Sequence, residues 1–204
     1  MRIGLDFDGT IILYEEVFHR CAVERFHMPR EIAVNKLAIR DWFWRTPAGK
    51  QEWIELQGIV YATRMDEAEM APGLEQFLET CRHKAIHVSI ISHRTEFPVI
   101  GPRVDLRERA RQWLDRAGFH SRLGFRREDV FFESSREEKI RRIAAQQCSK
   151  FIDDLEEVFQ EPTFPRNVEK LLYARGRRAA SPASDIKLFS EWDAIRSYFL
   201  TVAT

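Results

Sequence analysis

Two pairs of carboxylates stand out in the sequence because each pair follows a short apolar run. Asp6 and Asp8 close the first apolar run of the chain, and Asp153 and Asp154 close another. Carboxylates held this close repel one another unless a cation lies between them. Because Mg²⁺ prefers oxygen ligands, the two pairs favour a magnesium site. The alternative is that these residues form turns or cap helices, which are common uses of Asp.

Two further residues could bind an anion such as a phosphoryl group. Ser92 ends the apolar run at 86–91, where a hydroxyl and a backbone N–H could hold a phosphate oxygen. Lys139 lies in the first turn of a helix expected to begin after Ser135, where the helix dipole disfavours a cation. That position suggests a role in neutralising Asp6 and a bound phosphate. Taken singly, a turn serine and a solvated surface lysine are the favoured interpretations of these two residues.

The elements expected around these residues alternate between strands and helices. Apolar runs predict strands that end near residues 6, 91, 132, 152 and 173. Apolar residues at helical spacing predict helices over 74–81 and 105–117, one opened by Ser135 with Glu138, and a last one capped by Ser190. This alternation predicts an α/β fold, a parallel sheet with helices on both faces. Ligands bind such sheets beyond the carboxyl ends of the strands, so the polar strand-end residues should converge on one crevice.

Residues 15–70 form a helical block between segments of different character. The pattern predicts helices from residue 15, over 32–39 and over 53–61, with a break at 46–49. We therefore expect a core made of 1–14 and 71–204 and a helical insertion at 15–70. Its aromatic residues, such as Trp42 and Trp53, could line a lid over an anionic substrate. We favour the simpler interpretation that they form the insertion's own small core.

The composition narrows the class of protein. Basic and acidic residues balance at 32 each over 204 residues, which gives no indication of a nucleic-acid partner. The three cysteines are scattered without a CxxC pair, so we expect neither a disulfide framework nor a zinc knuckle. No apolar run is long enough to span a bilayer. A cytoplasmic protein with no membrane association fits these features.

Together the four clusters resemble the four sequence motifs of the haloacid dehalogenase-like (HAD) superfamily, in the same order along the chain. Asp6-Phe7-Asp8-Gly9-Thr10 is the most specific of them. The resemblance implies a modified Rossmann core with an inserted helical cap of the C1 type. The other three matches are Ile90-Ile91-Ser92, Lys139 and Phe151-Ile152-Asp153-Asp154.

The resemblance also implies catalytic roles. Asp6 would attack phosphorus and form an aspartyl-phosphate, and Asp8 would protonate the leaving oxygen and then activate water. Dehalogenases of this superfamily lack the second Asp, because a halide leaves without a proton. The presence of Asp8 therefore favours a phosphatase.

Ligand-binding roles follow from the same resemblance. Mg²⁺ would be held by Asp6, the backbone carbonyl of Asp8, Asp154 directly, and Asp153 directly or through water. The residues expected to bind the phosphoryl oxygens are Ser92, His93 and Lys139.

Three arginines could contact a small phosphorylated substrate. Arg94 lies two residues after Ser92, and its alternative role is an ion pair with a nearby acid. The other two, Arg45 and Arg64, lie in the insertion. The aromatic-rich insertion could also serve as a homodimer face.

Three other functions stay open at this point. A mutase would transfer the phosphoryl group to another acceptor. A phosphonatase would use a lysine from the cap, for which Lys36 and Lys50 are candidates. A catalytically silent binding protein is disfavoured because all four motif positions are occupied.

Overall fold

The computed structural model describes residues 1–175 and 183–202, and the chain forms two compact units. We call them the core unit (Met1–Ile12, Met70–Arg94 and Ala117–Thr204) and the insertion unit (Leu13–Glu69 and Thr95–Arg116). The insertion unit thus includes 95–116, which the sequence pattern had placed with the core.

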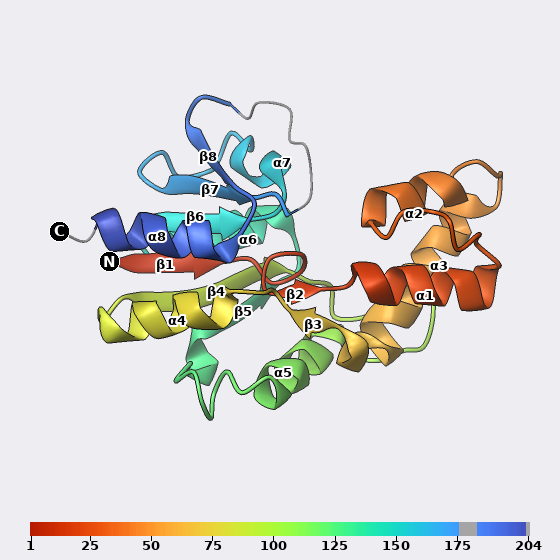
Figure 1. Cartoon of the computed structure of the whole chain (residues 1–204), viewed down its shortest axis with the longest axis horizontal. Coiled ribbons are helices and arrows are strands. Elements are labelled where there is room, and N and C mark those ends of the chain that lie inside the picture. Colours follow the sequence, from red (N-terminus) through yellow and green to blue (C-terminus); the bar gives the residue numbers. More distant parts are fainter. Residues whose placement is uncertain (176–182, 203–204) are drawn as a thin grey trace. The chain divides into compact units, whose positions relative to one another are not determined.

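A six-stranded parallel sheet forms the centre of the core unit (Figure 1). The strand order is β5-β4-β1-β6-β7-β8, so β1 lies between β4 and β6. Along the register, Leu5 of β1 lies opposite Ile90 of β4 and Ile152 of β6. The chain therefore leaves these three strands at the same edge. The strands are β1 (Arg2–Leu5), β4 (His87–His93), β5 (Val130–Glu133), β6 (Lys150–Asp153), β7 (Glu169–Tyr173) and β8 (Ile186–Phe189).

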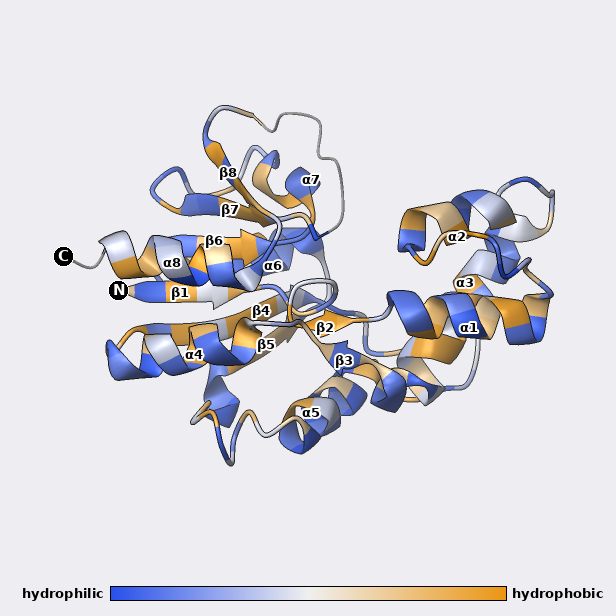
Figure 2. Cartoon of the chain, in the orientation of Figure 1, coloured by the Kyte–Doolittle hydropathy of each residue, from blue (hydrophilic) through white to orange (hydrophobic). Residues whose placement is uncertain are grey.

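Helices cover both faces of this sheet, as the sequence predicted. On one face are α4 (Leu74–His83) and α8 (Trp192–Val202), where the ring of Phe77 lies 5.0 Å from Trp192. On the other face are α6 (Arg136–Ala145) and α7 (Glu156–Phe159), which share a second apolar cluster with β6. Figure 2 shows hydrophilic and hydrophobic residues alternating along α4 and α8, as expected of helices with one face on a sheet.

The insertion unit is helical and has its own aromatic core. Phe18 stacks on Trp53 with ring centroids 5.4 Å apart, and Phe43 lies 6.1 Å from the same Trp53. Trp44, by contrast, is half exposed and stacks with Arg40. The core interpretation therefore holds for Phe43 and Trp53. The elements are α1 (Glu15–Phe26), α2 (Lys36–Phe43), α3 (Gly49–Thr63), the 3₁₀ turn η1 (Met65–Glu67) and α5 (Leu106–Arg116).

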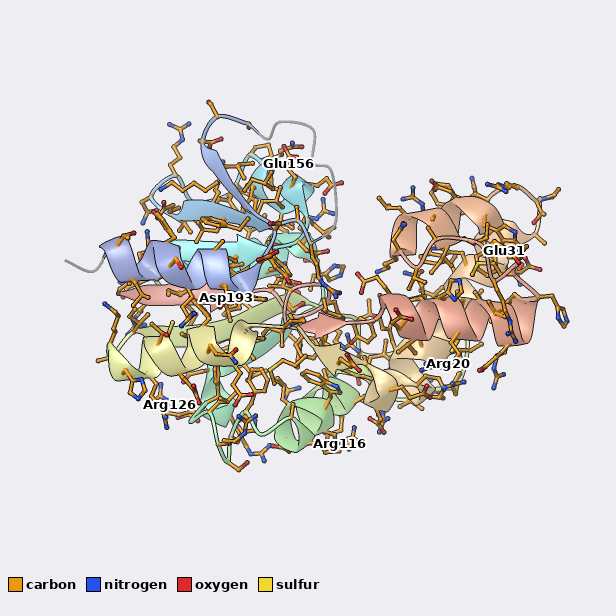
Figure 3. The ribbon with its side chains drawn as sticks, in the orientation of Figure 1. Arg20, Glu31, Arg116, Arg126, Glu156 and Asp193 are labelled. Carbon is orange, nitrogen blue, oxygen red and sulfur yellow. The ribbon has the colours of Figure 1, made fainter. Side chains whose placement is uncertain are left out.

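Specific contacts explain why 95–116 groups with the insertion. The indole of Trp113 donates to the Ala68 carbonyl at 3.0 Å, and Asp66 pairs with Arg109 and with Arg116, which is labelled in Figure 3. These partners lie some 40 residues earlier in the chain, beyond the reach of a local pattern.

Two short strands, β2 (Ile12–Leu13) and β3 (Glu69–Met70), pair where the chain passes between the units. A further 3₁₀ turn, η2 (Arg127–Asp129), precedes β5. The strands β2, β3 and β8 were not predicted from the sequence, because each of them is short or mixed in polarity. Across the described ranges, every helix is too short or too polar to cross a membrane.

The helix predicted over 32–39 is wrong in its position. The observed helix α2 begins at Lys36, because Asn35 is extended and its side-chain oxygen accepts a hydrogen bond from the Ala38 N–H at 2.8 Å. An Asn at this position caps a helix and marks its start. The apolar spacing before Asn35 was coincidental.

Ser135 caps α6 as predicted. Its hydroxyl accepts from the Glu138 N–H at 3.1 Å, while the Glu138 carboxylate accepts from the N–H of Ser134 at 2.9 Å. In a capping box the Glu138 carboxylate would accept from the N–H of Ser135 itself, so the observed contact lies one residue earlier in the chain.

We expect Ser135→Ala to lower the free energy of unfolding by about 1 kcal/mol, because it removes this cap. The midpoint of urea unfolding, with an unchanged slope, would measure the loss. Ser121→Ala is the matched control at an exposed position and should stay within about 0.5 kcal/mol of wild type. Equal midpoints for the two variants would show that the cap does not contribute.

Candidate active site

The loop after β1 is a compact turn that presents Asp8. The N–H groups of Ile11 and Ile12 both donate to the Phe7 carbonyl, at 2.9 and 3.1 Å, and Gly9 N–H donates to the Ile12 carbonyl at 2.9 Å. These backbone bonds fix residues 7–12 as a unit. Just before it, Asp6 is buried and its N–H donates to Ile152 of β6 at 2.9 Å.

Gly9 brings the two acidic segments into contact. Its φ of +84° lies in the left-handed region, and a Cβ built there would lie 2.5 Å from Oδ2 of Asp154. Glycine is therefore required both by the backbone conformation and by the approach of the carboxylate. The segments near residues 6 and 154 meet at this edge of the sheet.

Ser92 and Lys139 converge on one oxygen of Asp6. The Ser92 hydroxyl donates to Asp6 Oδ1 at 2.9 Å, and Lys139 Nζ donates to the same oxygen at 2.6 Å. Lys139 Nζ also donates to Asp153 Oδ2 at 2.6 Å. The ends of β1, β4 and β6 and the first turn of α6 therefore meet around Asp6 and the buried ammonium of Lys139.

The electrostatics reflect this crowding. Burial, together with the charge of Asp153, raises the pKa of Asp6 to about 7 against the lowering effect of the Lys139 charge. Burial alone would lower the pKa of Lys139, but the charges of Asp153 and Asp6 raise it above its usual value. Lys139 is therefore a fixed cation, and the acids around it favour additional positive charge.

Three carboxylates are placed to share a metal ion. Oxygen atoms of Asp6, Asp153 and Asp154 all lie within 4.8 Å of one another, and all three residues are buried. Asp153 is already engaged, because it accepts from Lys139 and from the Leu155 N–H at 3.0 Å. A hard cation with oxygen ligands fits this donor set.

Asp8 is paired with an arginine. Arg94 Nη1 lies 2.7 Å from each carboxylate oxygen of Asp8, and the arginine side chain is only 3% exposed. Of the two roles considered for Arg94, the structure shows the pair with a nearby acid. His93, which precedes it, keeps an exposed surface. Desolvation of its imidazole, followed by the charge of Lys139, lowers the pKa of this group.

The remaining candidates lie in the insertion unit. Arg64 pairs with Glu24 and Glu67, and Arg45 is exposed. Lys36 donates to the Tyr61 hydroxyl at 2.8 Å, and Lys50 is exposed.

Two contacts of the site were not predicted from the sequence. The Trp192 indole donates to the Thr10 carbonyl at 3.2 Å and so ties the first motif to α8. Gly9 was expected only to permit a turn, whereas it also makes room for Asp154. A tryptophan opening the last helix carries no local signal of such a contact.

Comparison with solved structures places this architecture among known folds. The structure of a predicted phosphatase from Clostridium acetobutylicum matches with a TM-score of 0.63 and 15% identity, covering 98% of each chain. A HAD family hydrolase from Deinococcus radiodurans R1, solved with bound phosphate and sodium, matches with a TM-score of 0.62 and 12% identity over 99% of this chain and 95% of that one. This chain has the HAD-like fold.

A third HAD-like structure agrees with this assignment. A HAD-superfamily hydrolase from Ehrlichia chaffeensis matches with a TM-score of 0.60 and 14% identity, over 100% of this chain and 97% of that one. No protein-family model matches the sequence, and no curated protein matches it. At these identities the likeness shows the HAD-like fold alone.

We expect Asp154→Asn to weaken Mg²⁺ binding about 10-fold or more, because it removes one carboxylate of the cluster. Calorimetric titration with Mg²⁺, and with Mn²⁺ as a spectroscopic probe, would measure the change. The control is Asp193→Asn at an exposed position of α8, labelled in Figure 3. Equal affinities for the two variants would remove Asp154 from the metal site.

We expect Lys139→Met to lower the free energy of unfolding by about 3–5 kcal/mol in metal-free buffer, because it leaves buried carboxylates without their cation. Added Mg²⁺ should restore part of this loss, since a divalent ion can replace the missing charge. Thermal unfolding with and without Mg²⁺ would show both effects. The control Lys84→Met, at an exposed position, should show neither the loss of stability nor the rescue by Mg²⁺. If Lys139→Met were as stable as wild type without metal, the electrostatic account would be contradicted.

Proposed function

We propose that this protein is a Mg²⁺-dependent phosphatase that hydrolyses a small-molecule phosphate monoester through an aspartyl-phosphate. One observation carries the proposal: Asp6 is held by both Ser92 and Lys139 beside two further buried carboxylates. A carboxylate oriented in this way suits nucleophilic attack on phosphorus. The HAD-like fold and the phosphatase and hydrolase neighbours support the same chemistry.

In the first half-reaction, an oxygen of Asp6 forms a bond to phosphorus while the bond to the leaving oxygen breaks. Asp8, protonated at this stage, gives its proton to that oxygen, and the alcohol departs. In the second, water attacks phosphorus, Asp8 takes a proton from it, and the bond to Asp6 breaks to release inorganic phosphate. Both aspartates return to their starting states.

The other polar residues would bind the phosphoryl group and the metal ion. Ser92 and Lys139, which contact Asp6, would also hold phosphoryl oxygens, and His93 would contribute to the same binding. Mg²⁺ would be held by Asp6, Asp154 and the Asp8 carbonyl, and it would neutralise charge gathered on the phosphoryl group. Asp153, with both oxygens accepting hydrogen bonds, is better suited to orient Lys139 than to bind the metal directly.

The substrate and its contacts extend this proposal. Arg45 and Arg64 are proposed contacts for further anionic groups of a small phosphorylated molecule. Residues 15–70 are proposed to act as its cap. A cytoplasmic location, the absence of a nucleic-acid or membrane partner and a homodimer stay predictions.

We expect Asp6→Asn to reduce turnover of p-nitrophenyl phosphate about 10³-fold or more, because an amide cannot form the acyl phosphate. Removal of Mg²⁺ with EDTA should abolish wild-type turnover, and Mg²⁺ should restore it. Release of inorganic phosphate measures both, and Asp193→Asn should behave as wild type. Equal turnover by Asp6→Asn would remove the nucleophile.

A panel of phosphorylated metabolites, with products identified, would separate the alternatives. Phosphoryl transfer to a second metabolite would indicate a mutase. Cleavage of a phosphonate that depends on Lys36 or Lys50 would indicate a phosphonatase. No turnover of any substrate, with Mg²⁺ bound, would favour a binding protein.

A further inference from the structure

The ion pair between Arg94 and Asp8 is an interaction of the site that the four motifs leave unexplained. Arg94 is 4% exposed, and one of its nitrogens lies 2.7 Å from each oxygen of the Asp8 carboxylate. Burying a guanidinium is costly unless it is paired, so this arginine is committed to its partner. Charge-assisted bonds of this length are also among the stronger contacts that a protein makes.

Arg94 is held by the sheet. Its N–H donates to the Glu133 carbonyl at 2.8 Å, which continues the pairing of β4 with β5 by one residue. Its guanidinium lies 5.7 Å from the ring of Phe7, which packs 5.5 Å from Phe132 of β5. The guanidinium therefore has a fixed place on the framework.

Asp8 is less constrained. It lies on the turn at 7–12, and its side chain is 24% exposed, against 3% for that of Arg94. A partly exposed carboxylate on a turn would sample several rotamers without a partner. The pair therefore ties the Asp8 side chain to the end of β4 through Arg94.

We propose that Arg94 is a positioning residue that holds the Asp8 carboxyl group in the orientation needed for proton transfer. This inference rests on the proposed function, in which Asp8 gives a proton to the leaving oxygen as its bond to phosphorus breaks and later takes one from water. Proton transfer requires the donor within hydrogen-bond reach of the leaving oxygen, so a loose Asp8 slows the reaction.

The test is the dependence of the rate on the leaving group. A leaving group of low pKa, such as p-nitrophenol, departs without protonation, whereas an alcohol of high pKa needs it. We expect Arg94→Met to lower kcat/KM about 100-fold for alkyl phosphates and less than about 10-fold for p-nitrophenyl phosphate. Arg94→Lys should fall between wild type and Arg94→Met, since an ammonium keeps the charge but not the shape.

A double-mutant cycle ties the effect to Asp8. Asp8→Asn removes the proton donor, so it should show the same dependence on the leaving group. Adding Arg94→Met to Asp8→Asn should then lower kcat/KM by less than a further factor of about 3, because the residue that Arg94 positions is already disabled. Independent, multiplicative losses in the double variant would overturn the inference.

The control is Arg126→Met. Arg126, labelled in Figure 3, also pairs with a carboxylate of the core unit, that of Asp129 at 2.8 Å. Arg126→Met should not change how the rate depends on the leaving group, even if it lowers the melting temperature.

Other outcomes have distinct meanings. An equal loss for all esters, with a raised KM and weaker inhibition by phosphate, would show that Arg94 binds substrate. A lowered melting temperature with unchanged leaving-group dependence would show a purely structural role. Either result overturns the positioning role of Arg94 without contradicting the proposed phosphatase function.

The proposed function can fail separately. Wild-type protein that turns over no phosphate ester would reject the phosphatase. Crystal structures of wild type and Arg94→Met would still decide the positioning role. An Asp8 carboxylate in the same well-defined place in both would overturn it, and one displaced or disordered only in the variant would support it.

Discussion

The buried ammonium of Lys139 is the interaction on which the site depends. It lies 2.6 Å from an oxygen of Asp6 and 2.6 Å from one of Asp153, so it joins the ends of β1 and β6 to α6. Two buried carboxylates without this cation would repel each other strongly, and burial already raises the pKa of Asp6. The arrangement requires β1 and β6 to be neighbours. It also requires α6 to begin one turn before Lys139, which is where Ser135 caps it.

Within the described part of the chain, Lys139 and Arg94 form ion pairs with different acids of the site. Lys139 serves the buried pair, while Arg94 serves Asp8 on the neighbouring turn. Oxygen atoms of Asp6, Asp153 and Asp154 all lie within 4.8 Å of one another. This concentration of buried carboxylates is the physical reason that the site suits a divalent ion.

Much of the site could be predicted because its acids and its serine lie at strand ends. The rule that parallel strands end at one edge brings Asp6, Ser92 and Asp153 together without any knowledge of side-chain contacts. The partner of Arg94 could not be predicted, since it depends on a turn more than 80 residues earlier. The grouping of 95–116 with the insertion likewise depends on distant partners, such as the Ala68 carbonyl for Trp113. Local patterns predict elements and their edges, whereas side-chain partners depend on the assembled fold.

The charges of the site also bear on how an anionic substrate would bind in the proposed reaction. A phosphate monoester is anionic, and at this edge it would meet the clustered carboxylates of Asp6, Asp153 and Asp154. Lys139 and Arg94 are both committed to acids of the site, so neither offers an unopposed positive charge. Like charges at this spacing in a buried site repel strongly. On the proposed function, Asp6 and Asp154 would hold a divalent cation, and its charge would offset these acids and attract the phosphate.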